Sequence, residues 1–354
     1  KLHEQRGCFH WHYVNFHTAL AEAEMLGMDD HVAALTQALG AYAQNQRDFA
    51  SANQQFTVLA KHHKQRDCAK GEVAAYHQLG MIAQERRGFA AAEQWYRKAL
   101  AICEKHGDEH SAAITYHQLG ILAVHERRDF AAAEQWYHKA LAIKEKHGDE
   151  HGAAFTYCQL GIIAEERRDF AAAEQWYLKA LTIWEKHGDE HGAAITYHQL
   201  GRIAEERRDF ATAEQWYHKA LAIWEKHGNE FGAASTYHQL GRIAEERRDF
   251  AAAEQWYLKS LAIKEQHGNE YGAAHAYHQL GNLSVLQGHF VESGRWFVRA
   301  IVTFSQQQDA HYAKMTTHNF LIVYRQAPPD DQAQLRQLWE EAGLGALPED
   351  GNPP

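Results

Sequence analysis

Histidine is the residue type in this chain with the widest chemical reach, because imidazole can bind metal ions and transfer protons near neutral pH. The 354 residues include 27 histidines, and the pentapeptide His-Gly-Asp-Glu-His occurs at 106–110, 147–151 and 187–191. Two imidazoles beside two carboxylates are candidate ligands for a divalent metal. Each copy, however, spans a helix end and a glycine turn, and the later copies at His227 and His267 keep only the first imidazole. We therefore predict that duplication explains the pentapeptide and that the chain binds no metal.

Other catalytic and nucleotide-binding signatures are missing from the sequence. It contains no G-x-x-x-x-G-K-[ST] phosphate loop, no G-x-G-x-x-G fingerprint, no H-E-x-x-H pair and no G-x-S-x-G elbow. We therefore predict no catalytic residues, no enzyme activity and no cofactor.

Charge and hydropathy exclude two further classes of partner. The formal net charge is -10, and no block of basic residues is present, so binding to a nucleic-acid backbone is not expected. No run of 18 apolar residues exists, which argues against a membrane span. The four cysteines lack a C-x-x-C spacing and are expected to be reduced thiols. These features predict a soluble, cytoplasmic protein.

A repeat of about forty residues must position any functional side chain. The phrase Tyr-His-Gln-Leu-Gly, once with cysteine in place of histidine, recurs with a period of 40 residues and a single step of 41. Residues 152–191 and 192–231 differ at only eight of their forty positions. Such a period predicts a solenoid, in which each unit packs only on its neighbours. The motif glycines are Gly80, Gly120, Gly161, Gly201, Gly241 and Gly281.

Each unit divides into two helical halves. In residues 192–228, apolar and small side chains recur every three or four positions in both halves, which predicts one buried stripe on each helix. Asp209 is a suitable N-cap for the second helix, and Gly228 is a suitable C-cap. Two antiparallel helices per unit are the expected result.

The spacing of eight residues in this unit resembles the tetratricopeptide repeat. They are Tyr197, Leu200, Gly201, Ala204, Phe210, Ala213, Tyr217 and Ala220. The resemblance covers roughly residues 31–308 and implies an all-α, right-handed superhelical solenoid of stacked antiparallel helix pairs. The units here are longer than the family norm of about 34 residues, as in kinesin-light-chain-like repeats. Glu225 also stands where the family often has proline.

The repeat also predicts the organisation of the chain. We expect an N-terminal half-repeat at 1–30, a degenerate first repeat at 31–70, six units at 71–310, capping helices at 311–343 and a flexible tail at 344–354. Phe9, Phe16, Leu20 and Gly27 keep the offsets of a second helix, so we expect the sequence to begin in the middle of a repeat. A longer native chain is expected.

Two other recurring phrases are assigned to structure rather than to binding. Glu-Glu-Arg-Arg at 165–168, 205–208 and 245–248 predicts a solvated helix end with local ion pairs. Gln-Trp at 175–176 and its copies could form an aromatic binding strip, but packing of the ring between adjacent units is favoured, because each tryptophan precedes the core tyrosine.

The resemblance implies that the first helix of each unit lines a concave groove, where a ligand would bind. At three positions on that helix the otherwise copied units differ, which singles out candidate contacts. The candidate ligand-binding residues, including two nearby glutamates, are His77, Ile114, His117, Phe155, Cys158, Ile162, Ile195, His198, Arg202, Glu205, His238, Arg242, Glu245, His278 and Asn282.

The candidate groove changes character along the chain. Phe155, Ile162 and Ile195 could receive an apolar side chain, whereas Arg202 and Arg242 could hold a carboxylate or another anion. Glu205 and Glu245 lie one helical turn from those arginines and could instead pair with them, leaving a self-satisfied surface. Both readings stay open at this stage.

The histidines at one groove position suggest a dependence on pH. With unperturbed pKa values near 6.5, stacked imidazoles would charge together as the pH falls towards about 6. Ligand affinity would then change between about pH 8 and 6. The alternative is that they are ordinary polar residues copied by duplication.

The expected function is recognition of a peptide or a segment of a partner protein. The repeats resemble the C-terminal sensor arrays of bacterial signal-transduction NTPases of the STAND class. That resemblance implies a switch, in which ligand binding relieves the autoinhibition of an upstream NTPase domain in the same native chain. A constitutive scaffold or adaptor would use the same surfaces without a switch.

Overall fold

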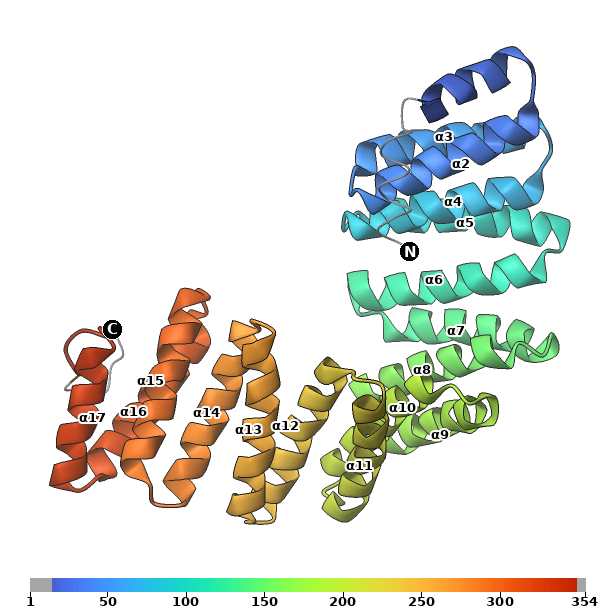
Figure 1. The fold of residues 1–354 in the computed structure, drawn as a ribbon. Coiled ribbons are helices and arrows are strands. Elements are labelled where there is room, and N and C mark those ends of the chain that lie inside the picture. The colour runs from blue at the N-terminus through green and yellow to red at the C-terminus, as the bar shows by residue number, and fades with distance from the viewer. Residues whose placement is uncertain (1–14, 349–354) are drawn as a thin grey trace. The chain divides into compact units, whose positions relative to one another are not determined.

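The computed structural model describes residues 15–348, and all of their regular secondary structure is helical. A helix at 15–25 is followed by sixteen more, α2 to α17, arranged as successive antiparallel pairs (Figure 1). Their bounds are α2 Asp29–Asn45, α3 Phe49–Gln65, α4 Ala69–Glu85, α5 Phe89–His106, α6 Glu109–Arg127, α7 Phe130–Lys146, α8 Glu150–Glu166, α9 Phe170–His187, α10 Glu190–Glu206, α11 Phe210–Lys226, α12 Glu230–Glu246, α13 Phe250–Gln266, α14 Glu270–Leu286, α15 Phe290–Gln306, α16 Ala310–Gln326 and α17 Pro329–Glu341.

The helices belong to two compact units that meet in sequence between Arg167 and Arg168. The N-terminal unit contains α2 to α8, and the C-terminal unit contains α9 to α17. The expected half-repeat at 1–30 and tail at 344–354 fall partly outside the described residues, because 1–14 and 349–354 are not described. No described helix has both the length and the apolar character that crossing a membrane requires.

Local sequence sets the ends of the helices. Asp209 caps α11, as expected, because its side chain accepts a hydrogen bond of 3.2 Å from the backbone N–H of Thr212. Gly228 lies in the turn after α11 with a φ of 63°, a left-handed conformation that glycine adopts at little cost.

In most helix pairs the turn between the two helices has an arginine in the left-handed conformation, a feature that the repeat pattern did not predict, whereas the turn between α14 and α15 has Gly288. Arg208 has a φ of 60°, and the backbone N–H of the next residue, Asp209, bonds to the Ala204 carbonyl at 2.9 Å. Residues other than glycine seldom adopt this backbone conformation. The same geometry recurs at Arg87, Arg128, Arg168 and Arg248.

The motif glycine allows the two helices of a pair to approach closely. Gly201 on α10 faces the ring of Tyr217 on α11, and a Cβ atom at Gly201 would lie 2.6 Å from that ring. Tyr217 is fully buried, as are Ala213 and Ala220 on the same helix. Small residues are therefore required on one helix so that a large ring can fill the space between the two.

The last two helices close the C-terminal unit with an apolar core of their own. Trp339 on α17 and Phe320 on α16 are buried, with ring centroids 5.1 Å apart. Leu335 joins them in a cluster with residues of α15. Pro328 and Pro329 start α17, where proline is tolerated because the first N–H groups of a helix have no intrahelical partner.

Candidate functional site: the first-helix face

The candidate residues lie on the first helix of each pair, and their exposed surface is called here the first-helix face. Because the chain forms two units, the face is described separately in each. In the N-terminal unit, α4, α6 and α8 carry His77, Ile114, His117, Phe155, Cys158 and Ile162. In the C-terminal unit, α10, α12 and α14 carry Ile195, His198, Arg202, Glu205, His238, Arg242, Glu245, His278 and Asn282.

The N-terminal part of the face exposes apolar side chains. Ile114 is 40% exposed, and Phe155 is 52% exposed with its ring 5.2 Å from that of His151. Ile162, two turns further along α8, is half-buried. Met81 on α4, at the position equivalent to Ile162, is also exposed. These exposed apolar side chains form a surface, and a ligand that removes it from water binds with a more favourable free energy.

The histidines of the face are largely buried. His198 lies against Tyr217 with a ring separation of 5.3 Å, and His117 lies against Tyr137 at 5.2 Å. Burial lowers the pKa of His117, His198, His238 and His278 to about 4, since an imidazolium loses its hydration there. The expectation that these imidazoles charge together near pH 6 is therefore wrong. The sequence correctly predicted that these histidines lie on the first helices, but it did not predict their burial.

The C-terminal part of the face is polar, and one of its arginines is already paired. Arg242 lies 2.9 Å from Glu205, which belongs to the preceding first helix. Glu205 also accepts a hydrogen bond of 3.0 Å from the Tyr217 hydroxyl, and Glu245 accepts one of 2.8 Å from Tyr257. For Arg242, the self-satisfied alternative is confirmed, although its partner comes from the neighbouring pair.

Other predicted contacts on this part of the face differ in exposure. Ile195 is 44% exposed, whereas His278 is buried and lies 2.9 Å from the Thr316 hydroxyl on α16. Arg202 donates to Gln199 at 3.1 Å, and Asn282 accepts from Asn319 at 3.3 Å. The contacts to α16 show that His278 and Asn282 connect helices, so fewer of their polar groups remain for a ligand.

One position on the second helices also borders the face and was missed. It is held by Cys103, Lys144, Trp184, Trp224, Lys264 and Phe304 in successive pairs. Lys144 is buried and donates hydrogen bonds of 3.0 Å to the Gly152 carbonyl and 2.9 Å to the Thr156 hydroxyl, both on the next first helix. The signal was present in the sequence, because this position varies while its neighbours are copied.

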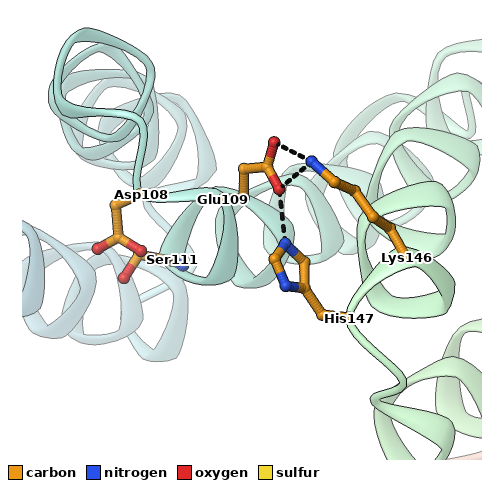
Figure 2. Close-up of polar contacts among 5 residues, drawn as sticks. All are labelled: Asp108, Glu109, Ser111, Lys146 and His147. Carbon is orange, nitrogen blue, oxygen red and sulfur yellow. Dashed lines mark hydrogen bonds and ion pairs between the residues drawn. The ribbon is translucent and has the colours of Figure 1, made fainter.

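Residues of the repeated pentapeptide connect the start of the first helix to the end of the second helix in the same pair. Figure 2 shows Glu109, at the start of α6, bonded to Lys146 at 2.7 Å and to His147 at 2.5 Å, both at the end of α7. These bonds lower the pKa of Glu109. Among residues 15–348, no three His, Cys, Asp or Glu side chains are arranged to hold a metal ion.

The charged and aromatic phrases also hold the helices together. Arg207 pairs with Glu174 at 2.6 Å and Arg247 with Glu214 at 2.7 Å, so these ion pairs join neighbouring helix pairs and are not local as expected. Trp216 stacks on Tyr197 of its own pair at 5.6 Å, with the Lys219 ammonium 4.3 Å from its ring. Packing therefore explains this ring, and the equivalent Trp256 also contacts a ring of the preceding pair, His218, at 6.0 Å.

Comparisons with known proteins agree with this geometry. The family model Tetratricopeptide repeat matches residues 72–146, 125–186, 152–226 and 192–266. No curated protein matches the sequence. Solved structures with a similar fold include BtubC (BKLC) from P. vanneervenii, with 24% identity and a TM-score of 0.57 over 63% of this chain and 92% of that one.

Two further solved structures cover more of the chain. One is the Signal Transduction ATPase with Numerous Domains protein with a tetratricopeptide repeat sensor, PH0952, from Pyrococcus horikoshii. It is 17% identical with a TM-score of 0.67 over 94% of this chain, which spans only 50% of its length. The other is the apo form of RapI, 17% identical with a TM-score of 0.56 over 72% of this chain and 98% of RapI. At these identities the similarity concerns the fold alone.

Proposed function

This chain belongs to the tetratricopeptide repeat family, and we propose that its first-helix face binds an extended protein segment as the ligand-sensing domain of a larger bacterial STAND-type signalling or defence ATPase. The family is a protein-interaction solenoid, and repeat arrays of this kind offer long surfaces assembled from many units. No catalytic role is proposed, and the expected location is the cytoplasm.

The exposed apolar residues of the N-terminal unit carry the binding proposal. Ile114 and Phe155 occupy equivalent positions on α6 and α8, where neighbouring residues of the motif are buried. A chain in extended conformation could cover both with alternate side chains, since the two first helices follow each other in the stack.

The sensor assignment is supported by the tetratricopeptide repeat sensor of PH0952, whose fold matches most of this chain. In such a protein, ligand binding to the array would relieve the autoinhibition of an upstream NTPase domain. The alternative is a constitutive scaffold that assembles protein complexes, and RapI and BtubC show that similar arrays occur in proteins of nearly the same length as the matched region. The genomic sequence before the codon for Lys1 separates the two: an NTPase domain there supports the sensor, and its absence supports the scaffold.

The binding proposal is tested with a displayed library of random peptides selected on the purified chain. We expect Phe155→Ser and Ile114→Ser each to weaken the selected peptides by at least about tenfold, which corresponds to about 1.4 kcal/mol. The control is Leu258→Ser, which removes a comparably exposed apolar side chain from the second helix α13. Peptides that respond to Leu258→Ser and ignore both first-helix variants would contradict the proposal.

A further inference from the structure

Lys264 is a half-buried cation without a partner. Its ammonium makes no hydrogen bond or ion pair with any described residue, and burial lowers its pKa. The side chain lines a cavity of about 220 Å³ in the C-terminal unit, together with Ser235, His238 and Asn269. Ser235 and Phe231, which lines the same cavity, are exposed, so the cavity opens on the first-helix face.

The equivalent Lys144 shows what Lys264 has lost. Lys144 bonds to the Thr156 hydroxyl and to a carbonyl, and the carboxylate of Asp149 favours its charge. Around Lys264, Ala276 on the next first helix, α14, replaces that threonine, and Asn269, the N-cap of α14, replaces that aspartate. Two substitutions thus remove a hydrogen-bond acceptor and a negative charge from the surroundings of the same ammonium.

One imidazole nitrogen beside Lys264 is also without a partner. His77 Nε2 and His278 Nδ1 lie 2.7 and 2.9 Å from the hydroxyls of Thr115 and Thr316 on the following first helix, whereas the equivalent position for His238 is Ala276. The buried Nδ1 atom of His238 has no hydrogen-bond partner among the described residues, and the same holds for Nδ1 of His117. A buried polar atom without a partner costs free energy unless a ligand supplies one.

The groups around the cavity are positively charged or neutral. Burial first, and then the charge on Lys264, lowers the pKa of both His238 and His275. Arg242 acts on His238 in the same direction, whereas Asp309 opposes the effect at His275. No carboxylate lines the cavity itself. A negative group placed there would therefore meet an ammonium and an imidazole nitrogen without displacing an existing ion pair.

We propose that this cavity binds one carboxylate group, supplied by an aspartate or glutamate side chain of the protein segment on the first-helix face. Lys264 provides the charge, and His238 and Ser235 provide hydrogen-bonding groups. Phe231 and Ile263 form an apolar wall along the methylene groups of the side chain. The source of the carboxylate rests on the proposed function, whereas the affinity of the cavity for a free carboxylate does not.

The test titrates the purified chain, with its histidine rings isotopically labelled, with sodium acetate or inorganic phosphate at constant ionic strength. We expect acetate to shift the ring signals of His238 and His275 with saturation, and Lys264→Met to abolish the shift. The double variant Asn269→Asp, Ala276→Thr gives Lys264 the partners that Lys144 has, and we expect it to weaken the binding of acetate at least tenfold. Lys144→Met is the matched control and leaves the shift intact.

Several outcomes would overturn this inference. A shift that never saturates, or one that persists in Lys264→Met, means that no site exists. Saturation by phosphate alone refutes the carboxylate assignment. Thermal unfolding adds a second check, because Lys264→Met removes a half-buried charge that has no partner and is expected to raise the unfolding midpoint. Lys144→Met instead breaks two hydrogen bonds and is expected to lower that midpoint. If acetate does not bind while the selected peptides still depend on Phe155, the carboxylate site is refuted and the proposed function stands.

Discussion

Glu205 on α10 and Arg242 on α12 lie 2.9 Å apart and join the first helices of consecutive pairs in the C-terminal unit. The Glu205 side chain is 11% exposed and the Arg242 side chain 48% exposed, so the two residues differ in hydration. Burial raises the pKa of Glu205, although Arg242 opposes this effect. The carboxylate therefore depends on its partner more than the arginine does.

Replacing Arg242 with alanine is expected to destabilise the fold in a pH-dependent way. Because the folded-state pKa of Glu205 lies above its usual 4.5, ionisation of this group costs stability as the pH rises through that value. Without Arg242 the cost increases, so we expect a loss of about 1–3 kcal/mol at pH 8 and a smaller loss at pH 5. Urea unfolding at both pH values measures it. Arg247→Ala removes a more exposed pair with Glu214 and is expected to cost less than about 1 kcal/mol.

The buried histidines predict a second pH dependence. The folded-state pKa of His198 is about 4, against 6.5 in the unfolded chain, so the unfolded chain binds the additional proton between these values. Stability is then lost as the pH falls from about 6.5 to 4, with a slope of up to about 1.4 kcal/mol per pH unit for each such imidazole. We expect His198→Gln to reduce the slope in unfolding measurements across this range. Replacement of His218, which is exposed on α11, controls for the loss of an imidazole, and an unchanged slope in His198→Gln would contradict the burial.

The periodic pattern was enough to predict the helix pairs and the N-cap at Asp209. Both depend on residues close in sequence, so one copy of the repeat defines them. The variable positions on the first helices came from comparing the copies. The depth of His198 and the pairing of Glu205 with Arg242 depend on how consecutive pairs rotate against each other, which the spacing within a unit does not specify. Lys264 was missed for a related reason, since its missing partner, at Ala276, lies on the next helix.

The close approach at Gly201 predicts a sensitive core position. Gly201→Ala places a methyl group against the Tyr217 ring, so we expect a loss of about 1–3 kcal/mol from overpacking. The combination with Tyr217→Leu creates space for the methyl group. In a double-mutant cycle measured by chemical unfolding, the two losses are expected to sum to more than the loss of the double variant. Simple additivity would show that the helices can move apart to accept the side chain.

The cysteines provide a chemical test of burial in the N-terminal unit. Cys103 is 1% exposed, and burial raises the pKa of its thiol to about 11, whereas Cys68 is exposed in the turn before α4. Only the thiolate reacts with iodoacetamide, so at pH 8 we expect alkylation of Cys68 in the folded chain and little at Cys103. Peptide mass spectrometry after timed labelling measures both sites, and labelling in urea confirms that each cysteine can react. Equal rates for the two thiols in the folded chain would mean that the second helix α5 does not pack on its neighbours as described.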